Sequence, residues 1–379
     1  MGWAELRGLF CGGWWFTCPP IHDKLHDKPH DKPHDTSHDT RRTYFIVISY
    51  KTVLASNQSL KSTRNGLTAA FLGATNGIGL GALRALTAHS TSPTIYVVGR
   101  SANRLETLFI ELRALNHTAT FVPVLVGDLT LAKDAQQAAI DITKTATKLD
   151  LLVMSPGYIG FNYDLSPEGL ERCMCIRYYA RTRFLLTLLP LLRAAPHPRV
   201  VSVLGGGKEG PLWPEDWLLK KHFGLINASG AAGSMQTLMF EALSAQPENG
   251  KVAFVHGFPG LVGGTGLTFK GLGTIGSFLV SWVLMPVTRL VGYSTTEAGE
   301  RVLFAATGGR FPAKAAYAVE DIGVVEKGSD GKVGSGVYLV NGDSSVVPGN
   351  KQLQVLRADD VGAKVYKHTM EEFARIANS

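Results

Sequence analysis

The chain has 379 residues, of which 45% are hydrophobic and 18% charged, and its formal net charge at pH 7 is +7. This length suits one large α/β domain or two small ones, and the composition is that of a globular protein with a sizeable core. The positive charge is spread along the chain without a helix-turn-helix, zinc-finger or RNA-binding signature. We therefore expect no nucleic acid partner, and the charge is only weak evidence for a phosphate-bearing ligand.

The cysteine count and the apolar runs favour a cytoplasmic chain without a membrane span. There are 4 cysteines, too few for a disulfide framework, which indicates a reduced compartment. The longest apolar run, 275–291, contains Ser281 and Pro286 and is shorter than the roughly 20 residues that a spanning helix needs. We interpret residues 275–293 as the lid of a substrate pocket, with shallow membrane contact as the alternative. No signal-peptide core is present near the N-terminus.

Residues 1 to about 66 differ from the rest of the chain. An HDK/HDT pattern between residues 22 and 40 repeats every four residues. Histidine and aspartate are metal ligands, but a proline-interrupted repeat of low complexity is more typical of a solvated segment that buries no core. We therefore expect no metal site and assign residues 1–66 to a low-complexity or linker segment, in which 44–50 is a stray strand or linker.

From residue 67 onward, apolar strands alternate with amphipathic helices. This alternation predicts parallel strands joined by right-handed crossovers, and continuously apolar strands predict a sheet that is covered on both faces. We expect a doubly wound (Rossmann) α/β sheet in a single domain, 67–379, with a C-terminal extension after residue 340. The expected strands cover 68–72, 94–98, 121–126, 149–154, 199–204, 252–256 and 337–340, and the expected helices 79–88, 105–115, 131–147, 167–192 and 229–245.

A glycine-rich loop, GATNGIG at 73–79, follows the first expected strand and opens the first helix. Three glycines at this spacing let the backbone turn tightly and approach a pyrophosphate, while the helix N-terminus presents free N–H groups to it. A purely turn-forming role for these glycines is the alternative. The cofactor-binding candidates in this loop are Gly73, Thr75, Asn76, Gly77, Ile78 and Gly79.

The second expected strand ends in Val98-Gly99-Arg100. A site that prefers NAD usually has an acidic residue here, which binds the ribose 2′-hydroxyl. The guanidinium of Arg100 instead suits the 2′-phosphate of NADP. The alternative is a surface arginine that caps the next helix.

Several segments between residues 67 and 340 resemble the short-chain dehydrogenases/reductases. GATNGIG is similar to that family's TGxxxGIG loop, RVVSV at 199–203 to its fifth strand, and Pro259-Gly260 to its PG motif. GKEGP at 207–211 and RTRF at 181–184 are similar to filamentous-fungal members, many of which are encoded beside secondary-metabolite genes. The resemblance implies that Asp128 contacts the adenine and that MSPG at 154–157 replaces the family's NNAG loop, which adds the cofactor-binding candidates Ser155 and Gly157.

The same resemblance indicates that the usual catalytic residues are missing from this chain. The family normally uses Asn, Ser, Tyr and Lys. None of the 11 tyrosines is followed by lysine four residues later. Matching the helix after the fifth strand places the tyrosine near Phe223 and the lysine near Asn227. The serine position falls at Leu204 or Gly205 and the asparagine position near Arg177. Phenylalanine cannot transfer a proton and glycine has no hydroxyl, so the usual relay is not expected.

Substitute groups lie nearby in the sequence. His222 is the leading catalytic candidate because an imidazole titrates near neutral pH, with a solvated basic loop as the alternative. Arg177 is the second candidate, as a ligand of a cofactor phosphate or substrate carboxylate, or as a salt-bridge partner. Lys208, Lys220, Lys221 and Ser229 are further possibilities.

These observations predict an NADP-dependent oxidoreductase that acts on a small apolar carbonyl or alcohol in fungal secondary metabolism. The alternative is a non-redox isomerase or cyclase, or a nucleotide-binding pseudoenzyme on the same fold, since fold alone does not fix chemistry. A small-molecule substrate is expected as partner, and a homo-oligomer is possible because family members commonly assemble.

Overall fold

A computed structural model describes residues 47–266, 268–271, 273, 282, 285–317 and 324–378, and the structural statements below concern these residues. The histidine repeat lies outside them, as do residues 275–281, 283 and 284 of the segment that we interpreted as a lid.

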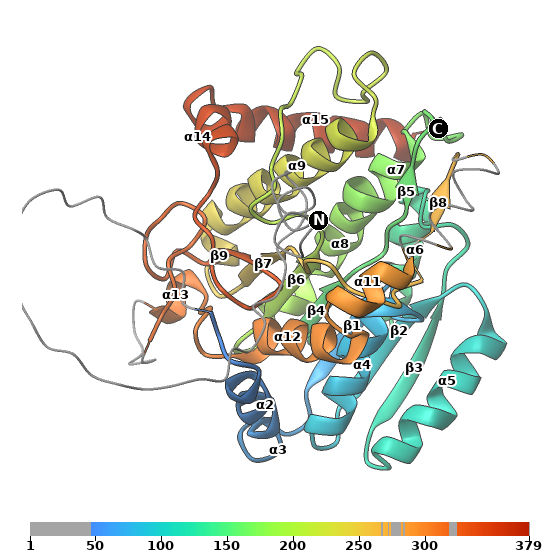
Figure 1. The fold of residues 1–379 in the computed structure, drawn as a ribbon, viewed down its shortest axis with the longest axis vertical. Helices are drawn as coiled ribbons and strands as arrows, with labels where there is room; N and C mark the ends of the chain where they lie inside the picture. The colour runs from blue at the N-terminus through green and yellow to red at the C-terminus, as the bar shows by residue number, and fades with distance from the viewer. Residues whose placement is uncertain are drawn as a thin grey trace, which may run out of the picture.

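A seven-stranded sheet forms the centre of the molecule (Figure 1). Its order is β3-β2-β1-β4-β6-β7-β9 and every neighbouring pair is parallel. This confirms the doubly wound sheet. Strand order reverses between β1 and β4, and dinucleotides bind beyond the carboxyl ends of the strands at such a switch point. The strands are β1 Thr68–Leu72, β2 Thr94–Gly99, β3 Thr120–Leu125, β4 Leu151–Met154, β6 Arg199–Val203, β7 Ala253–Gly257 and β9 Val337–Val340.

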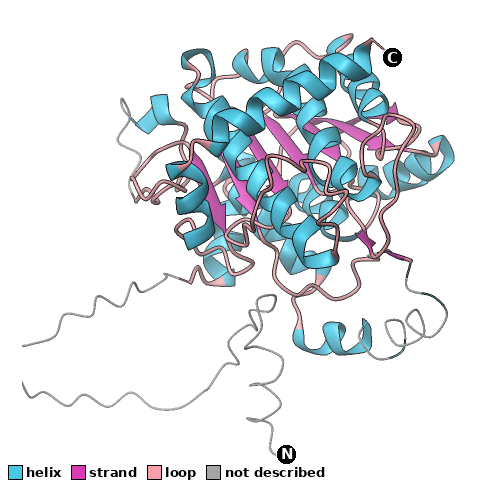
Figure 2. Cartoon of the chain, turned by 90° about the horizontal axis from the view of Figure 1, so that it is seen from above, coloured by secondary structure: helices cyan, strands magenta, loops and turns pink. Residues whose placement is uncertain are grey.

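Helices cover both faces of the sheet (Figure 2), and each face has its own hydrophobic core. This explains the continuously apolar strands, because every strand residue meets a covering helix on one side or the other. One face carries α2 (Tyr50–Gln58), α4 (Gly77–His89), α5 (Ala102–Leu115) and α12 (Thr295–Thr307), and the other α6 (Ala132–Thr143), α8 (Ala180–Arg193) and α9 (Leu225–Ala245). The shorter helices are α3 (Leu60–Thr63), η2 (Pro247–Asn249), α11 (Met285–Val291) and α13 (Lys314–Tyr317).

The C-terminal extension forms two helices, α14 (Lys351–Ala358) and α15 (Val361–Ala377). In Figure 1, α15 lies across α9 and α8 as an additional layer. Its apolar residues Val365 and Phe373 are buried in the same core as those helices. The hydroxyl of Tyr179 also lies 2.8 Å from Nε2 of His368. The extension is therefore part of the folded core.

Three segments differ from the sequence prediction. Residues 50–63, which we assigned to the linker, form α2 and α3, and α2 packs against α12. The expected helix 167–192 begins only at residue 172 and is divided into α7 (Arg172–Met174), a π-helical turn η1 (Cys175–Tyr179) and α8. A short parallel pair, β5 (Ile159–Gly160) with β8 (Phe269–Lys270), was not predicted; two-residue strands carry too little periodicity to be recognised.

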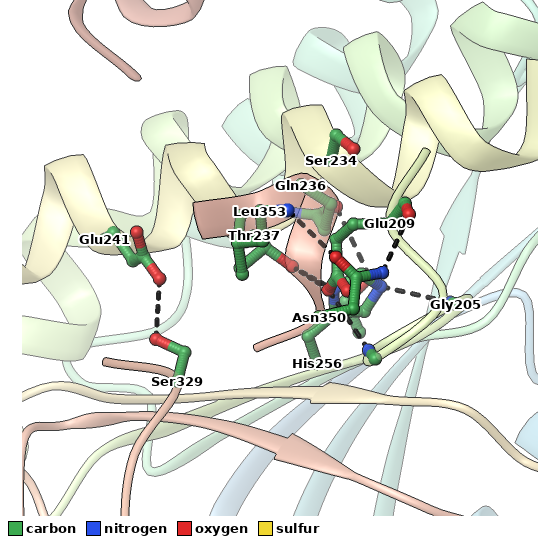
Figure 3. A network of polar contacts seen from close by, with 12 residues as sticks. Gly205, Glu209, Ser234, Gln236, Thr237, Glu241, His256, Ser329, Asn350 and Leu353 are labelled. Carbon is green, nitrogen blue, oxygen red and sulfur yellow. Dashed lines mark hydrogen bonds and ion pairs between the residues drawn. The ribbon is translucent and has the colours of Figure 1, made fainter. Parts of the chain in front are cut away.

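A buried polar network fixes the glycine loop after β6 (Figure 3). His256 is fully buried, and its Nε2 accepts a hydrogen bond of 3.0 Å from the Gly205 N–H. Its Nδ1 must therefore carry the proton that is donated to the Thr237 hydroxyl, 2.8 Å away. That hydroxyl in turn donates to Oε1 of Glu209 at 2.8 Å, which also accepts from the Gly207 N–H.

Burial disfavours the charged form of both ionisable members of this network. Burial, helped by the charge of Arg181, lowers the pKa of His256 to about 3. Burial raises the pKa of Glu209, against the hydrogen bonds from Thr237 and the backbone. Oε2 of Glu209 has no hydrogen-bond partner in the described part of the chain, so ionisation of this carboxyl would leave a charge without full compensation.

Contact between α4 and α12 depends on two glycines. A Cβ at Gly299 would lie 2.1 Å from the Gly81 carbonyl carbon. We expect Gly299→Ala to lower the free energy of unfolding by about 2–3 kcal/mol, because the helices must separate. Urea denaturation would measure this loss. Gly309→Ala is the matched control, since a Cβ there meets nothing within 4 Å; equal stability of the two variants would contradict the tight crossing.

The raised pKa of Glu209 predicts a pH dependence of stability. Because the folded pKa lies above the unfolded value, stability is fully present below about pH 4.3 and falls as pH rises towards the folded pKa. Glu209→Gln keeps the accepting oxygen and cannot ionise. The fall in stability with rising pH that comes from Glu209 should therefore be absent in this variant. The test compares urea midpoints at pH 5 and pH 7.5 for the wild type, Glu209→Gln and the surface control Glu106→Gln. If the urea midpoint of Glu209→Gln changes between the two pH values as much as that of the wild type, the raised pKa of Glu209 is contradicted.

Candidate nucleotide site and active site

The glycine loop between β1 and α4 forms a cradle that larger residues would fill. Gly73 has φ +86°, and a Cβ there would lie 2.5 Å from the Pro156 nitrogen; a Cβ at Gly79 would lie 2.3 Å from Oγ of Ser155. Gly77 has φ +59°, and its Cβ would lie 2.5 Å from the Thr265 carbonyl oxygen. Glycine is therefore required for the tight packing of this turn, which places the N-terminus of α4 at the switch point, where a pyrophosphate would fit.

The other loop candidates lie around this cradle. Asn76 caps α4 by accepting a 2.8 Å hydrogen bond from the Gly77 N–H. Ser155 donates to the Gly73 carbonyl at 2.9 Å, which joins the loop after β4 to the cradle. Thr75 is half-buried beside them, and Ile78 packs against a small apolar cluster of Val262, Tyr293 and Ala298.

Arg100 lies exposed just beyond the carboxyl end of β2. The side chain that caps α5 is Ser101, which accepts from the Arg104 N–H at 3.4 Å. No ion pair holds Arg100 among the residues that the structure describes. Its guanidinium is therefore available for an anion on the edge of the sheet next to the cradle.

Asp128, which follows β3, is held as a hydrogen-bond acceptor. It accepts from the N–H and hydroxyl of Thr130 at 2.8 and 2.7 Å, and Arg172 lies 3.3 Å away. Partial burial opposes ionisation, but these hydrogen bonds and the charge of Arg172 keep the pKa of Asp128 below its usual value. The half-exposed carboxylate can accept from an amino group such as that of adenine.

A buried arginine that sequence reasoning missed lies beneath the loop after β4. Arg181 is 1% exposed, and its Nη1 donates to Oγ of Ser202 at 2.8 Å and to the Val203 carbonyl at 2.9 Å. It also binds the carbonyls of Met154 and Pro156. One guanidinium thus joins the carboxyl ends of β4 and β6. The candidate Gly157 follows Pro156 and is exposed.

Arg177 and Ser229 meet at the centre of the candidate active site. Arg177 lies in the π-helical turn η1 and is 7% exposed; its Nη1 donates to Oγ of Ser229 at 2.7 Å and its Nη2 to the Tyr158 carbonyl at 2.8 Å. Ser229 is half-buried in the second turn of α9. Sequence reasoning named both residues without pairing them, because a contact between residues 52 positions apart has no local signal.

The remaining catalytic candidates lie together in the loop before α9. Nδ1 of His222 is 2.9 Å from Oδ2 of Asp216, and its ring stacks on Trp213 at 4.4 Å. Asp216 also accepts from the Lys220 and Lys221 N–H groups. Burial opposes the ionisation of Asp216, but the hydrogen bonds that its carboxylate accepts keep its pKa below the usual value. No hydrogen bond described here links His222 to Arg177 or Ser229.

Phe223 and Asn227, which we matched to the family's tyrosine and lysine positions, both lie at the start of α9. Phe223 precedes α9 and packs edge-on against Tyr163 at 5.5 Å. Asn227, in the first turn, donates to the His222 carbonyl at 2.8 Å. Gly205 donates its N–H to His256 and so lies at the end of β6, as expected for the serine position. Ser229, not Phe223, is the α9 side chain that faces Arg177.

Within the described ranges, no group of three or more His, Cys, Asp or Glu side chains is arranged to hold a metal ion. The same part of the chain contains no helix with the length and hydropathy needed to cross a membrane.

The chain is similar to known proteins over most of its length. A profile of short chain dehydrogenases matches residues 68–210. An oxidoreductase of Emericella nidulans is 35% identical, covering 85% of this chain and 97% of its own, and the oxidoreductase andH of Emericella variicolor is 32% identical over 87% and 98%. The solved NADP complex of Pseudomonas aeruginosa RhlG is 17% identical with a TM-score of 0.47, covering 70% of this chain and 96% of that one. The chain belongs to the short-chain dehydrogenase/reductase family.

Proposed function

We propose that this protein is an NADP-dependent oxidoreductase that acts on a small apolar carbonyl or alcohol in fungal secondary metabolism. The observation that carries the proposal is the tight glycine turn at the switch point, where a Cβ at Gly73, Gly77 or Gly79 would clash with the neighbouring backbone or with Ser155. Such a turn presents the N-terminus of α4 to a pyrophosphate. Membership of an oxidoreductase family and fungal relatives that are named oxidoreductases support it.

Each part of the cofactor would meet a distinct group. The pyrophosphate would lie on the glycine loop and the first turn of α4, with Thr75, Asn76 and Ile78 around it. Arg100 would bind the 2′-phosphate, and Asp128 the adenine amino group. Ser155 and Gly157 would border the nicotinamide half. When bound, this cofactor supplies or accepts the hydride.

Ser229 and Arg177 would handle the substrate oxygen. Arg177 donates a hydrogen bond to Oγ of Ser229, so the hydroxyl proton of Ser229 is free to be donated to a carbonyl oxygen. Transfer of that proton leaves the serine oxygen negative, and the guanidinium 2.7 Å from it stabilises this charge until solvent restores the proton. Arg177 thus takes the charge-stabilising part that lysine plays in the resembled family.

His222 is the second proposed proton donor. Asp216 binds Nδ1 and fixes the imidazole, as a carboxylate does in many acid/base pairs. Its position in the loop before α9 brings it to the same end of the helix as Ser229.

A second function has one observation in its favour. The tyrosine–lysine pair that the family uses is absent, because no tyrosine of the sequence is followed by lysine four residues later. A non-redox isomerase or cyclase, or a nucleotide-sensing pseudoenzyme, would need only the cradle. Consumption of bound NADPH by any carbonyl substrate separates the two functions. A cytoplasmic location and self-association remain predictions.

Arg100→Ala tests the cofactor assignment. We expect it to weaken NADPH binding by about tenfold to a hundredfold and NADH binding by less than twofold, because only NADPH has the 2′-phosphate. Calorimetry on the full chain measures both dissociation constants. Arg104→Ala, one turn into α5, is the control. Equal losses for the two nucleotides would remove Arg100 from the site, and no binding of either by the wild type would refute the proposed function.

Ser229→Ala and His222→Gln distinguish the two proton donors. If Ser229 donates, Ser229→Ala should lower kcat at least a hundredfold with nucleotide affinity unchanged, because the donor of general acid catalysis typically contributes that much. His222→Gln should then change kcat less than threefold. Turnover is followed by NADPH absorbance in a screen of apolar ketones. The reverse pattern would assign the proton to His222.

A further inference from the structure

Two arginines concentrate positive charge at the carboxyl ends of β4 and β6. Arg181 is 1% exposed and Arg177 7% exposed, and they lie one helical turn apart at the junction of η1 and α8. The partners of Arg181 are three carbonyls and one hydroxyl, all formally neutral. No carboxylate lies within ion-pair distance of either guanidinium in the part of the chain that the structure describes.

Burial acts on the ionisable groups around the two arginines. Burial and the neighbouring Arg177 lower the pKa of Arg181 to about 9, so it stays charged at neutral pH. The nearby acids are Glu171 and Glu209, and burial raises the pKa of both. His256 is neutral. Lys208 and Lys270 add positive charge from above, over the rings of Phe258 and Tyr158 at 5.2 and 4.4 Å.

A dinucleotide at the switch point would lie in the electrostatic field of Arg181 and Arg177. The oxidised and reduced forms of the dinucleotide differ by one charge. Oxidised nicotinamide carries a positive charge that reduced nicotinamide lacks, while the phosphates are the same. At an effective dielectric of about 20, two unit charges roughly 10 Å apart change an affinity by about tenfold. Because the guanidinium of Arg181 is buried, salt screens its charge less than that of a surface residue.

We propose that the buried charges of Arg181 and Arg177 make this site selective for NADPH over NADP⁺, and that the protein works in the direction of carbonyl reduction. The inference rests on the nucleotide site proposed above. In that direction the carbonyl carbon gains the hydride that the reduced cofactor supplies, and its oxygen gains a proton from the chain. The same field stabilises the negative charge that develops on that oxygen.

The test is the ratio of the dissociation constants for NADP⁺ and NADPH, measured by calorimetry on the full chain at one ionic strength. We expect NADPH to bind about tenfold more tightly to the wild type. Arg181→Met should reduce the ratio to threefold or less, and Arg181→Lys, which keeps the charge, should preserve most of it. Arg183→Met is the control, because this arginine on the same helix faces Gln136 and Phe373 and its loss should leave the ratio unchanged.

Arg181 also holds two loops, so Arg181→Met is first checked by circular dichroism. If it does not fold, Arg177→Met decides, with an expected severalfold fall in the ratio. Equal affinity of the wild type for both redox forms would overturn the inference and leave the nucleotide site standing. The inference would also be overturned if the folded variants Arg181→Met and Arg177→Met kept the wild-type ratio of the NADP⁺ and NADPH dissociation constants. No binding of either form would refute the proposed function as well.

Discussion

The candidate site depends on one guanidinium that is enclosed where the sheet ends. Arg181 binds carbonyls of the loop after β4 and of β6 together with the Ser202 hydroxyl. A buried carbonyl without a hydrogen bond is costly, and Arg181 supplies donors to three of them at the sheet edge. Arginine is suited to this place because its planar donors reach several acceptors at once. Arg181 holds the loop after β4, and Ser155 in this loop donates a hydrogen bond to the Gly73 carbonyl. The glycine loop therefore rests on the segment that Arg181 fixes.

Buried side chains also fix the conformation of the loop after β6. Gly205 and Gly207 donate their N–H groups to His256 and Glu209, so the segment where the family has its serine is fixed by buried side chains. A hydroxyl at this place is absent, and the pair of Arg177 and Ser229 lies across the site instead. The π-helical turn η1 turns Arg177 towards α9, in keeping with the frequent use of such turns at functional sites.

Much of the fold was predictable from sequence because its signals are local. The strand from Thr68 to Leu72 and the glycine loop after it identify the first βα unit on their own, and the seven strands followed from apolar runs. The additional layer formed by α15 and the division of the helix around Arg177 were not predictable in this way. Helical periodicity looks the same in an α-helix with or without one inserted residue, and the packing of α15 on α9 joins segments far apart in the chain.

The site was harder to predict because its key contacts join distant segments. His222 was the leading candidate because it is an imidazole in a basic loop, yet the side chains that it contacts, Asp216 and Trp213, lie within ten residues of it. Arg181 looked like one more basic residue of an amphipathic helix, and only burial at 1% exposure identifies it as the cation beneath the site. A charge in that position acts on any ligand through distance and dielectric alone. In the function proposed here, the two arginines at the carboxyl edge of the sheet take the place of the family's tyrosine–lysine pair.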